Sequence, residues 1–368
     1  MSLQFVVTPA IIAVVLGALL SALLIVPLIA VQYRSWGTLS LSRLFLILEF
    51  MVYLIAIPMY TLLPIGIDVA AVCAAGAGPV TQHQPFAFVD NVRTTWASTT
   101  LRGFLGSDVV QEPVLNVIFF VPLGVFLRKL NRWPVWAVVL AGLGTSLLVE
   151  LTQLTGNWGS AECAYRVFSV DDLILNTAGT IIGIIFAPLL ELFPGVRLDP
   201  GERHRARRIT RSRRVVQLFC DWLTYTLIAT FGGIVATAGV AALSPIDLAA
   251  PVDALTAMTH LAVGTVLFVV IPLFTGGETL GERVVLIEVR TEQGYGPGIG
   301  QILAKAFAGW MPYTMLDALA VSGEDWAWPA IVGWAGFQVL YTLRNPEGLS
   351  MRVSRLRRFD RRLPLPSA

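Results

Sequence analysis

The stretch GTSLLVELTQLTGNWGSAECAYRVFSVDDLILNTAGTIIG, from Gly144 to Gly183, contains two apolar runs separated by a short polar connection. Its ionisable side chains lie in or beside the connection, and none lies in the middle of a run. Charged groups are costly at membrane depth. The pattern therefore indicates two membrane-spanning helices with a polar cluster at one shared end, where the carboxylates and the arginine need a partner or a function.

The whole chain has the composition of a helical membrane protein. Its 368 residues are 55% hydrophobic, and the mean hydropathy is +0.72. Apolar runs of roughly 17 to 25 residues recur, which is the length that crosses about 30 Å of hydrocarbon. We predict an all-α, polytopic integral membrane protein of about nine transmembrane helices in two modules. The expected spans lie near residues 5 to 31, 42 to 63, 113 to 127, 134 to 155, 171 to 193, 215 to 243, 254 to 274, 303 to 320 and 328 to 343. The eighth is short and contains Lys305, Pro312 and Asp317, so an interfacial helix or a re-entrant segment stays open as an alternative there.

Basic clusters and acidic loops alternate along this pattern. The loops at 244 to 253 and 321 to 327 contain acids and no Lys or Arg. Since basic residues prefer the cytoplasmic side, the nine spans predict an N-terminus outside and a C-terminus inside. The first run is interpreted as a retained span, because no basic residue precedes it. The basic positions on the predicted inner side are Arg34, Arg43, Arg128, Lys129, Arg132, Arg197 to Arg214 and the arginines from Arg344 onward.

Composition divides the chain into four segments. We expect a five-span domain at 1–193, whose first span is accessory, a basic cytoplasmic linker at 194–214, a domain of about four spans at 215–352, and a basic cytoplasmic tail at 353–368. The linker has Pro and Gly and then a run of arginines without an apolar face. We expect the linker and the tail to contact anionic lipid headgroups. Membrane lipids are thus the predicted partners, and nucleic acid is not.

The expected outer cluster draws on the third, fourth and fifth spans and on the connection. Glu150 and Gln153 share a helix face, and so do Asp172 and Asn176. Two interpretations stay open: a polar cluster that only fixes helix packing, or a site in which Arg166 binds a phosphate or carboxylate while an acid handles a proton or a divalent cation. The candidate binding residues are Asn116, Glu150, Gln153, Arg166, Asp171, Asp172 and Asn176.

Together these residues resemble the VanZ-like membrane family over roughly residues 40 to 193. The motifs are Asn116 with Pro122 and Gly124, then Glu150 with Gln153, then RVFSVDD at 166 to 172, and NTAG at 176 to 179. The resemblance implies a bacterial cell-envelope protein of the cytoplasmic membrane and an effect on susceptibility to teicoplanin-type glycopeptides. This chain has Ser169 where the family often has an acid.

The second half resembles the RDD family of membrane domains. The motifs are Arg214 and Asp221, and TGGETLGERVVLIEVRTEQG at 275 to 294. RNPEGLSMRV at 344 to 353 resembles the closing motif of that family, with Ser350 and Met351 in place of the expected polar pair. From the residues alone we expect a glycine turn, a short strand and an inner ion-pair cluster. The candidate residues of that cluster are Arg214, Asp221, Glu278, Glu282 and Arg283.

Three functions remain open: recognition of a polar lipid or a lipid-linked wall precursor at the outer face, transport of an ion or small solute through membrane-embedded acids, and a non-catalytic scaffold. An oxidising exterior would permit a disulfide between Cys73 and Cys163, against two free thiols. The histidines are too scattered for a metal site. The sequence identifies no cofactor, and whether the protein catalyses a reaction is left open.

Overall fold

The computed structural model describes residues 3–61, 69–74, 81–129, 132–161, 163–164, 166–192, 205–243, 249–345 and 347–363. The chain divides into two compact units, which are described separately. Unit 1 comprises Met1–Ala22 and Ser40–Leu198, and unit 2 comprises Leu23–Leu39 and Asp199–Ala368. The first part of the expected linker, 194–204, the first half of the acidic loop at 244 to 253, and the end of the tail, 364–368, lie outside the described residues.

The all-α membrane architecture is confirmed. Within the described ranges, seven helices are long and apolar enough to cross a membrane. They correspond to the first seven expected spans, and they are Val14–Trp36, Leu41–Met59, Asp108–Lys129, Val135–Leu154, Val170–Leu190, Arg211–Ala242 and Val252–Phe274.

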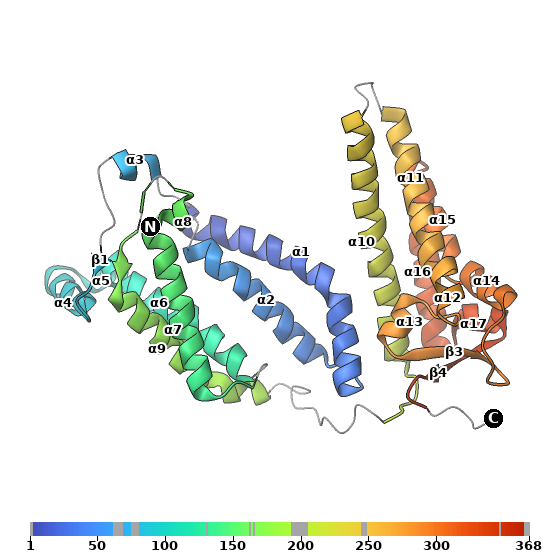
Figure 1. The fold of residues 1–368 in the computed structure, drawn as a ribbon, viewed down its shortest axis with the longest axis horizontal. Helices are drawn as coiled ribbons and strands as arrows, with labels where there is room; N and C mark the ends of the chain where they lie inside the picture. Colours follow the sequence, from blue (N-terminus) through green and yellow to red (C-terminus); the bar gives the residue numbers. More distant parts are fainter. Residues whose placement is uncertain are drawn as a thin grey trace. The chain divides into compact units, whose positions relative to one another are not determined.

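Unit 1 is built on the packing of α6 against α9 (Figure 1). Its elements are the first part of α1 (Leu3–Trp36), α2 (Leu41–Thr61), α3 (Val69–Ala74), β1 (Thr81–Gln82), α4 (Ala87–Ser98), α5 (Leu101–Leu105), α6 (Asp108–Lys129), α7 (Val135–Leu154), α8 (Gly156–Gly159), β2 (Phe168–Ser169), α9 (Val170–Phe186) and the 3-10 helix η1 (Ala187–Leu192).

Small residues let α6 and α9 approach closely. A Cβ atom added to Gly124 would overlap the carbonyl oxygen of Thr180, and one added to Gly179 would overlap that of Val117. Gly183 faces the Val121 carbonyl in the same way. Since hydrocarbon offers no hydrophobic drive between helices, such close backbone contact is what holds membrane helices together. It also fixes how the polar residues at the ends of α6 and α9 face each other.

The connection between α2 and α6 is folded over one end of unit 1. β1 pairs in parallel with β2, so that Thr81 lies opposite Phe168 and Gln82 opposite Ser169. The helices α4 and α5 follow, and Trp96 of α4 packs edge-on against Phe104 of α5. The described part of this connection, 81–107, thus contains β1, α4 and α5, and we call it the lid.

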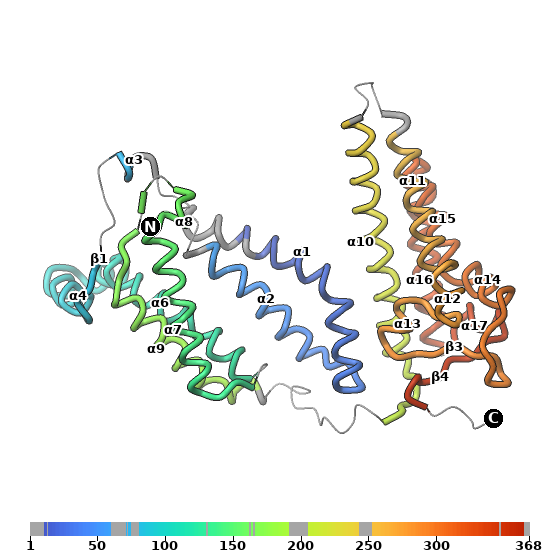
Figure 2. The backbone as a smooth tube through the Cα atoms, in the orientation of Figure 1, coloured from blue at the N-terminus to red at the C-terminus, as the bar shows by residue number. Residues whose placement is uncertain are grey.

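Unit 2 contains four helices that form a ring. Each of the pairs α10–α11, α11–α15, α15–α16 and α16–α10 is in contact, and the backbone trace shows the four side by side (Figure 2). Its elements are the second part of α1, α10 (Arg211–Leu243), α11 (Ala249–Thr265), the π-helix η3 (Val266–Val270), α12 (Ile271–Phe274), α13 (Leu280–Val284), β3 (Ile287–Thr291), α14 (Ile299–Ala308), α15 (Met311–Val321), α16 (Ala327–Arg344), α17 (Gly348–Ser354) and β4 (Leu356–Asp360).

A polar contact lies inside this ring. The Nδ1 atom of His260 on α11 lies 2.7 Å from Oδ2 of Asp317 on α15. The Tyr225 hydroxyl on α10 donates to the same oxygen at 2.6 Å. Three of the four helices are therefore joined at one carboxylate, which explains why an acid is tolerated in this part of the chain.

The expected eighth span, near 303 to 320, is divided between two helices, α14 and α15. The chain breaks between α14 and α15 at Gly309, whose φ and ψ are −113° and −98°. Trp334 donates to the freed carbonyl of Gly309 at 3.0 Å, and Gln338 donates to that of Ala308 at 3.0 Å. The expected ninth span corresponds to α16, which has 18 residues and is less apolar than the seven helices above.

The C-terminal tail is structured up to the end of β4, which the sequence did not predict. β3, the expected strand, pairs antiparallel with β4 from Ile287 opposite Asp360 to Thr291 opposite Leu356. The glycine turn before it has Gly276 and Gly277 at positive φ. Arginines of the tail form ion pairs inside unit 2.

Candidate functional site

Three helices of unit 1 bring predicted site residues together where α9 begins. Asn116 Nδ2 on α6 donates to Oδ1 of Asp172 on α9 at 2.7 Å. Glu150 on α7 is 2% exposed, and its Oε2 accepts from the backbone N–H of Ser169 at 2.9 Å. Because each helix contributes one side chain, the cluster depends on the packing of α6, α7 and α9.

Asn176 and Gln153 lie on the buried side of the same cluster. Asn176 Nδ2 donates to the Ser146 hydroxyl at 2.9 Å. Its Oδ1 is buried and has no hydrogen-bond partner within the described part of the chain. Gln153 is 4% exposed and turns with Glu150 toward the protein interior. An unused acceptor next to buried polar groups is uncommon and marks this place for a ligand or a water molecule.

Asp171 belongs to a different interaction from its neighbour. Its carboxylate accepts from the backbone N–H groups of Phe86 and Phe88 at 2.5 and 3.0 Å, at the beginning of α4. Its own helix, α9, has no side-chain cap. A carboxylate at a helix N-terminus satisfies amides that have no partner within the helix. Asp171 therefore fixes the lid.

Arg166 faces carboxylates without contacting them. Its positive charge attracts Glu112, Glu150 and Asp172, yet no hydrogen bond or ion pair of its side chain to another described residue is found. Glu112 was missed by the sequence analysis. It lies one turn before Asn116 on α6, and this i, i+4 spacing on one helix face is the signal that would have found it.

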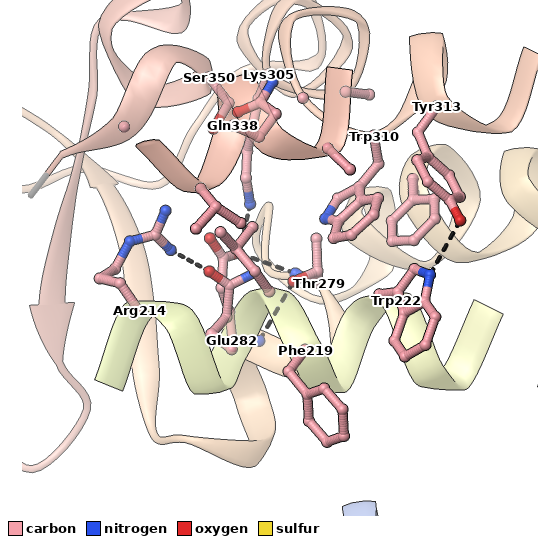
Figure 3. A pocket seen from close by; sticks show the side chains of 18 of the residues that line it. Arg214, Phe219, Trp222, Thr279, Glu282, Lys305, Trp310, Tyr313, Gln338 and Ser350 are labelled. Carbon is pink, nitrogen blue, oxygen red and sulfur yellow. Dashed lines mark hydrogen bonds and ion pairs between the residues drawn. The ribbon is translucent and has the colours of Figure 1, made fainter. Parts of the chain in front are cut away.

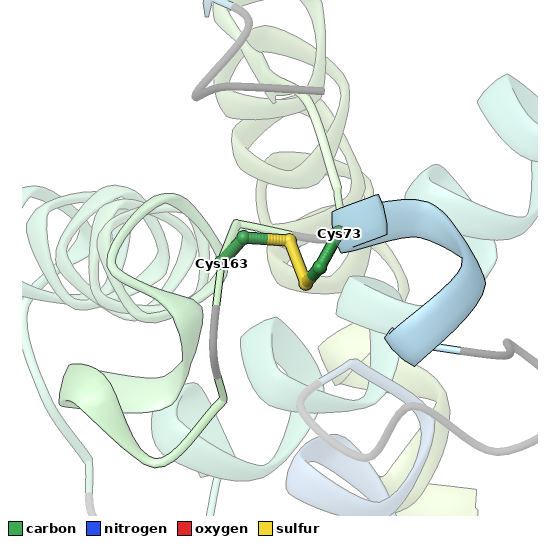
Figure 4. Close-up of a disulfide and its surroundings, with 2 residues drawn as sticks. All are labelled: Cys73 and Cys163. Atoms are coloured by element: carbon green, nitrogen blue, oxygen red, sulfur yellow. A yellow bond between two sulfur atoms is a disulfide. The ribbon is translucent and has the colours of Figure 1, made fainter. Parts of the chain in front are cut away.

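A disulfide joins the α2–α6 connection to the α8–β2 connection, at the end of unit 1 where α9 begins. Cys73 of α3 pairs with Cys163, which lies between α8 and β2 (Figure 4). The two cysteines are 90 residues apart in the sequence. The β1–β2 pairing and the Asp171 hydrogen bonds are two further links between the α2–α6 connection and the segment from α8 to the start of α9. Arg166 lies in that segment. We call this end of unit 1 the disulfide end.

Residues 50–191 match the VanZ/LLP1 family model. The N-terminal half thus contains a VanZ-like domain, which includes all seven residues of the predicted outer cluster. No curated protein and no solved structure matches the chain.

The remaining candidates lie beyond the VanZ-like domain, in unit 2, where they are split between two groups. In the first, Gln217 accepts from Arg214 and donates to Asp221. Asp221 also accepts from the Thr279 hydroxyl at 2.8 Å and from the Gly281 N–H at 2.7 Å. A Cβ at position 281 would overlap this carboxylate, so the close approach requires glycine. Arg214 and Asp221 are therefore connected through Gln217 and do not form a direct ion pair.

Glu282 belongs to the first group, with Arg214, and forms the centre of a buried ion cluster. Lys305 Nζ donates to its Oε2 at 2.5 Å, and Arg358 Nε donates to its Oε1 at 3.2 Å. Burial alone would raise the pKa of Glu282, but Lys305, Arg358 and Arg214 lower it to about 2. Glu282 is accordingly ionised at neutral pH. Lys305 and Arg358 were absent from the predicted cluster, because they come from distant parts of the sequence.

Glu278 and Arg283 form the second group. The Glu278 carboxylate pairs with Arg361, and Arg283 lies 3.9 Å away and is 40% exposed. Burial raises the pKa of Glu278, which the arginines partly offset. A similar pair lies next to it, since Arg213 donates to Asp360 at 2.7 Å. Within the described residues, no group of three or more His, Cys, Asp or Glu side chains is arranged to hold a metal ion.

Proposed function

We propose that the VanZ-like domain binds the polar headgroup of an envelope lipid or a lipid-linked wall precursor at its disulfide end. The observation that carries this proposal is Arg166, which faces three acids but has no side-chain partner among the described residues. A guanidinium has five N–H donors and suits a phosphate or carboxylate. The surrounding acids would then bind the amine of a headgroup or accept a proton from it.

Charge and redox chemistry support one orientation in the membrane. The disulfide favours an oxidising, extracytoplasmic location for its end of unit 1. Arg128 and Lys129 lie at the opposite end of α6, which favours the cytoplasm. We therefore propose a bacterial cytoplasmic-membrane protein with the N-terminus outside and the C-terminus inside. By its VanZ-like domain, it would affect susceptibility to teicoplanin-type glycopeptides.

Unit 2 is proposed to be an RDD-like domain. The linked residues Arg214, Gln217 and Asp221 at the start of α10 support this assignment. Transport through Asp221 is the second candidate function. It is less well supported, because both oxygens of this buried carboxylate already accept hydrogen bonds from Gln217, Thr279 and Gly281. A scaffold role predicts that changes at Arg166 or Glu150 would reduce the folded yield first.

Native mass spectrometry of the full-length wild type and of Arg166→Ala tests the proposal. We expect a defined phosphate- or carboxylate-bearing lipid to accompany the wild type and to be lost from the variant at equal melting temperature. Arg93→Ala is the matched control, since Arg93 is an exposed lid arginine whose nearest acid, Asp90, lies 3.9 Å away. If wild type and Arg166→Ala carry the same bulk phospholipid, the binding proposal fails and the scaffold interpretation is favoured.

A further inference from the structure

Unit 2 contains a cavity of about 340 Å³ that the proposed function does not use. It lies among α10, α13, α14, the α14–α15 break, α16 and β4 (Figure 3). The volume is at the lower end of the range of about 300 to 1,000 Å³ that is usual for small-molecule sites. The residues that line it all belong to unit 2.

One side of the cavity is cationic. Arg214, Lys305 and Arg358 line it, and Glu282 is the acid among the lining residues. Glu282 already accepts from both Lys305 and Arg358. Arg214 is left without a carboxylate in hydrogen-bond contact, since Gln217 stands between it and Asp221. The cavity lining therefore carries an excess of positive charge.

Arg214 has donor capacity that the described part of the protein does not use. It is 1% exposed, and its Nε has no hydrogen-bond partner. A buried guanidinium with unpaired donors is costly unless a ligand or water completes it. An anionic oxygen would satisfy both the charge and the missing hydrogen bond.

The other side of the cavity is aromatic. Its rings come from Phe219, Trp222, Phe268, Trp310, Tyr313 and Trp334. Phe268 and Trp310 stack with ring centroids 5.1 Å apart, and Trp222 Nε1 donates to the Tyr313 hydroxyl at 2.9 Å. In Figure 3, Trp222, Trp310 and Tyr313 lie on the side of the view away from Arg214. The indole N–H groups of Trp222 and Trp334 are already bonded, so this side offers a ligand mainly ring surface.

We propose that this pocket binds an anionic amphiphile, with its phosphate or carboxylate head at Arg214 and Lys305 and its hydrocarbon against the Trp222, Trp310 and Trp334 rings. A free inorganic anion would leave the aromatic side uncovered. A neutral or cationic amphiphile would leave Arg214 unpaired. The site is independent of the VanZ-like domain, so it stands or fails separately from the function proposed above.

The test is a thermal unfolding titration of the full chain in a neutral detergent. Dodecyl phosphate, added at a few mole per cent of detergent, is expected to raise the melting temperature of the wild type in a saturable way. Inorganic phosphate, dodecanol and dodecyltrimethylammonium are expected to have no such effect. An equal shift with inorganic phosphate would mean a free-anion site, and an equal shift with dodecanol would mean an apolar site; either result would overturn the proposal.

A matched pair of variants connects the effect to this pocket. Ser350 lines the cavity, and Ser350→Asp adds a negative charge there without removing a member of the ion cluster. Ser322→Asp makes the same change at an exposed position after α15, whose hydroxyl donates only to Leu319. We expect Ser350→Asp to weaken dodecyl phosphate binding at least tenfold and Ser322→Asp to leave it unchanged. If both variants bind like the wild type, the anion does not occupy this cavity.

Discussion

The Lys305 ammonium donates to the Glu282 carboxylate at 2.5 Å, and the Glu282 side chain is fully buried. Arg358 holds the other oxygen of the same carboxylate at 3.2 Å. One acid thus joins α13, α14 and β4, which lie far apart in the sequence. We therefore expect the stability of unit 2 to be sensitive to a substitution at Glu282.

Replacing Glu282 by Gln should strongly destabilise unit 2. The variant leaves two buried cations without a counter-charge, which typically costs about 3 to 5 kcal/mol. Glu292→Gln is the control, because Glu292 and Arg357 form a pair whose side chains are 60% and 57% exposed, and such pairs contribute about 1 kcal/mol or less. Denaturant unfolding in detergent measures both. Equal losses in the two variants would contradict a central role for Glu282.

The contribution of Glu282 should also depend on pH. Its folded-state pKa is about 2, below the ordinary value of 4.5, so folding favours the ionised form. The stabilisation is present above the unfolded-state pKa and is lost as pH falls through the folded-state pKa. The stability difference between wild type and Glu282→Gln should therefore shrink as pH falls from about 5 to about 2. A difference that stays constant over this window would exclude the ion pairs as its origin.

Asp171→Asn should loosen the lid while leaving the membrane helices intact. The carboxylate accepts from the Phe86 and Phe88 amides, and loss of such a cap costs about 0.5 to 2 kcal/mol at the start of α4. Hydrogen exchange of the first α4 amides should become faster by the corresponding factor. Asp90→Asn is the control, since Asp90 is exposed and lies 3.9 Å from Arg93 on the same helix. Unchanged exchange in Asp171→Asn would show that the disulfide and the strand pair suffice to hold the lid.

Much of the fold could be predicted from the sequence, because span length and apolarity are local properties. Glu150 and Asp172 were placed in one cluster for the same reason: the connection between their helices is short. The break at Gly309 was not predictable in this way, because the carbonyls it frees are bound by Trp334 and Gln338, which are 25 and 30 residues away.

The ion cluster of unit 2 shows the same limit. The sequence placed Glu282 in one ion-pair cluster with Arg214, Asp221, Glu278 and Arg283, whereas its ion-pair partners are Lys305 and Arg358, 23 and 76 residues away. Side-chain pairing across such separations depends on the tertiary fold and leaves no local spacing pattern. Glu112 differs, since its i, i+4 relation to Asn116 was visible and was overlooked.

The disulfide predicts the thiol count of the protein. The chain has three cysteines, of which Cys73 and Cys163 are paired and Cys220 is free. Maleimide labelling of unfolded protein isolated without reductant should modify one thiol, and labelling after reduction should modify all three. Cys73→Ser should expose Cys163 to labelling and lower the melting temperature, because loss of a disulfide that closes a loop of this length removes up to about 5 kcal/mol of stability. Three labelled thiols without reductant would contradict the disulfide.

The glycines of the α6–α9 interface give a prediction with an internal control. In Gly124→Ala the new methyl group would overlap the Thr180 carbonyl oxygen, so the helix backbones must separate. Such overpacking costs about 1 to 3 kcal/mol. Gly144 lies on α7 with no atom within 4 Å of an added Cβ, and Gly144→Ala should be neutral or slightly stabilising, since Ala is the better helix former.

Unfolding of both variants in mixed neutral and anionic detergent measures the difference. Gly124→Ala should also weaken the Asn116–Asp172 hydrogen bond, because that bond joins the same two helices at 2.7 Å. A structural role of Gly124 therefore predicts that lipid retention in native mass spectrometry falls together with stability. If Gly124→Ala and Gly144→Ala unfold alike, close packing of α6 on α9 does not hold the cluster together.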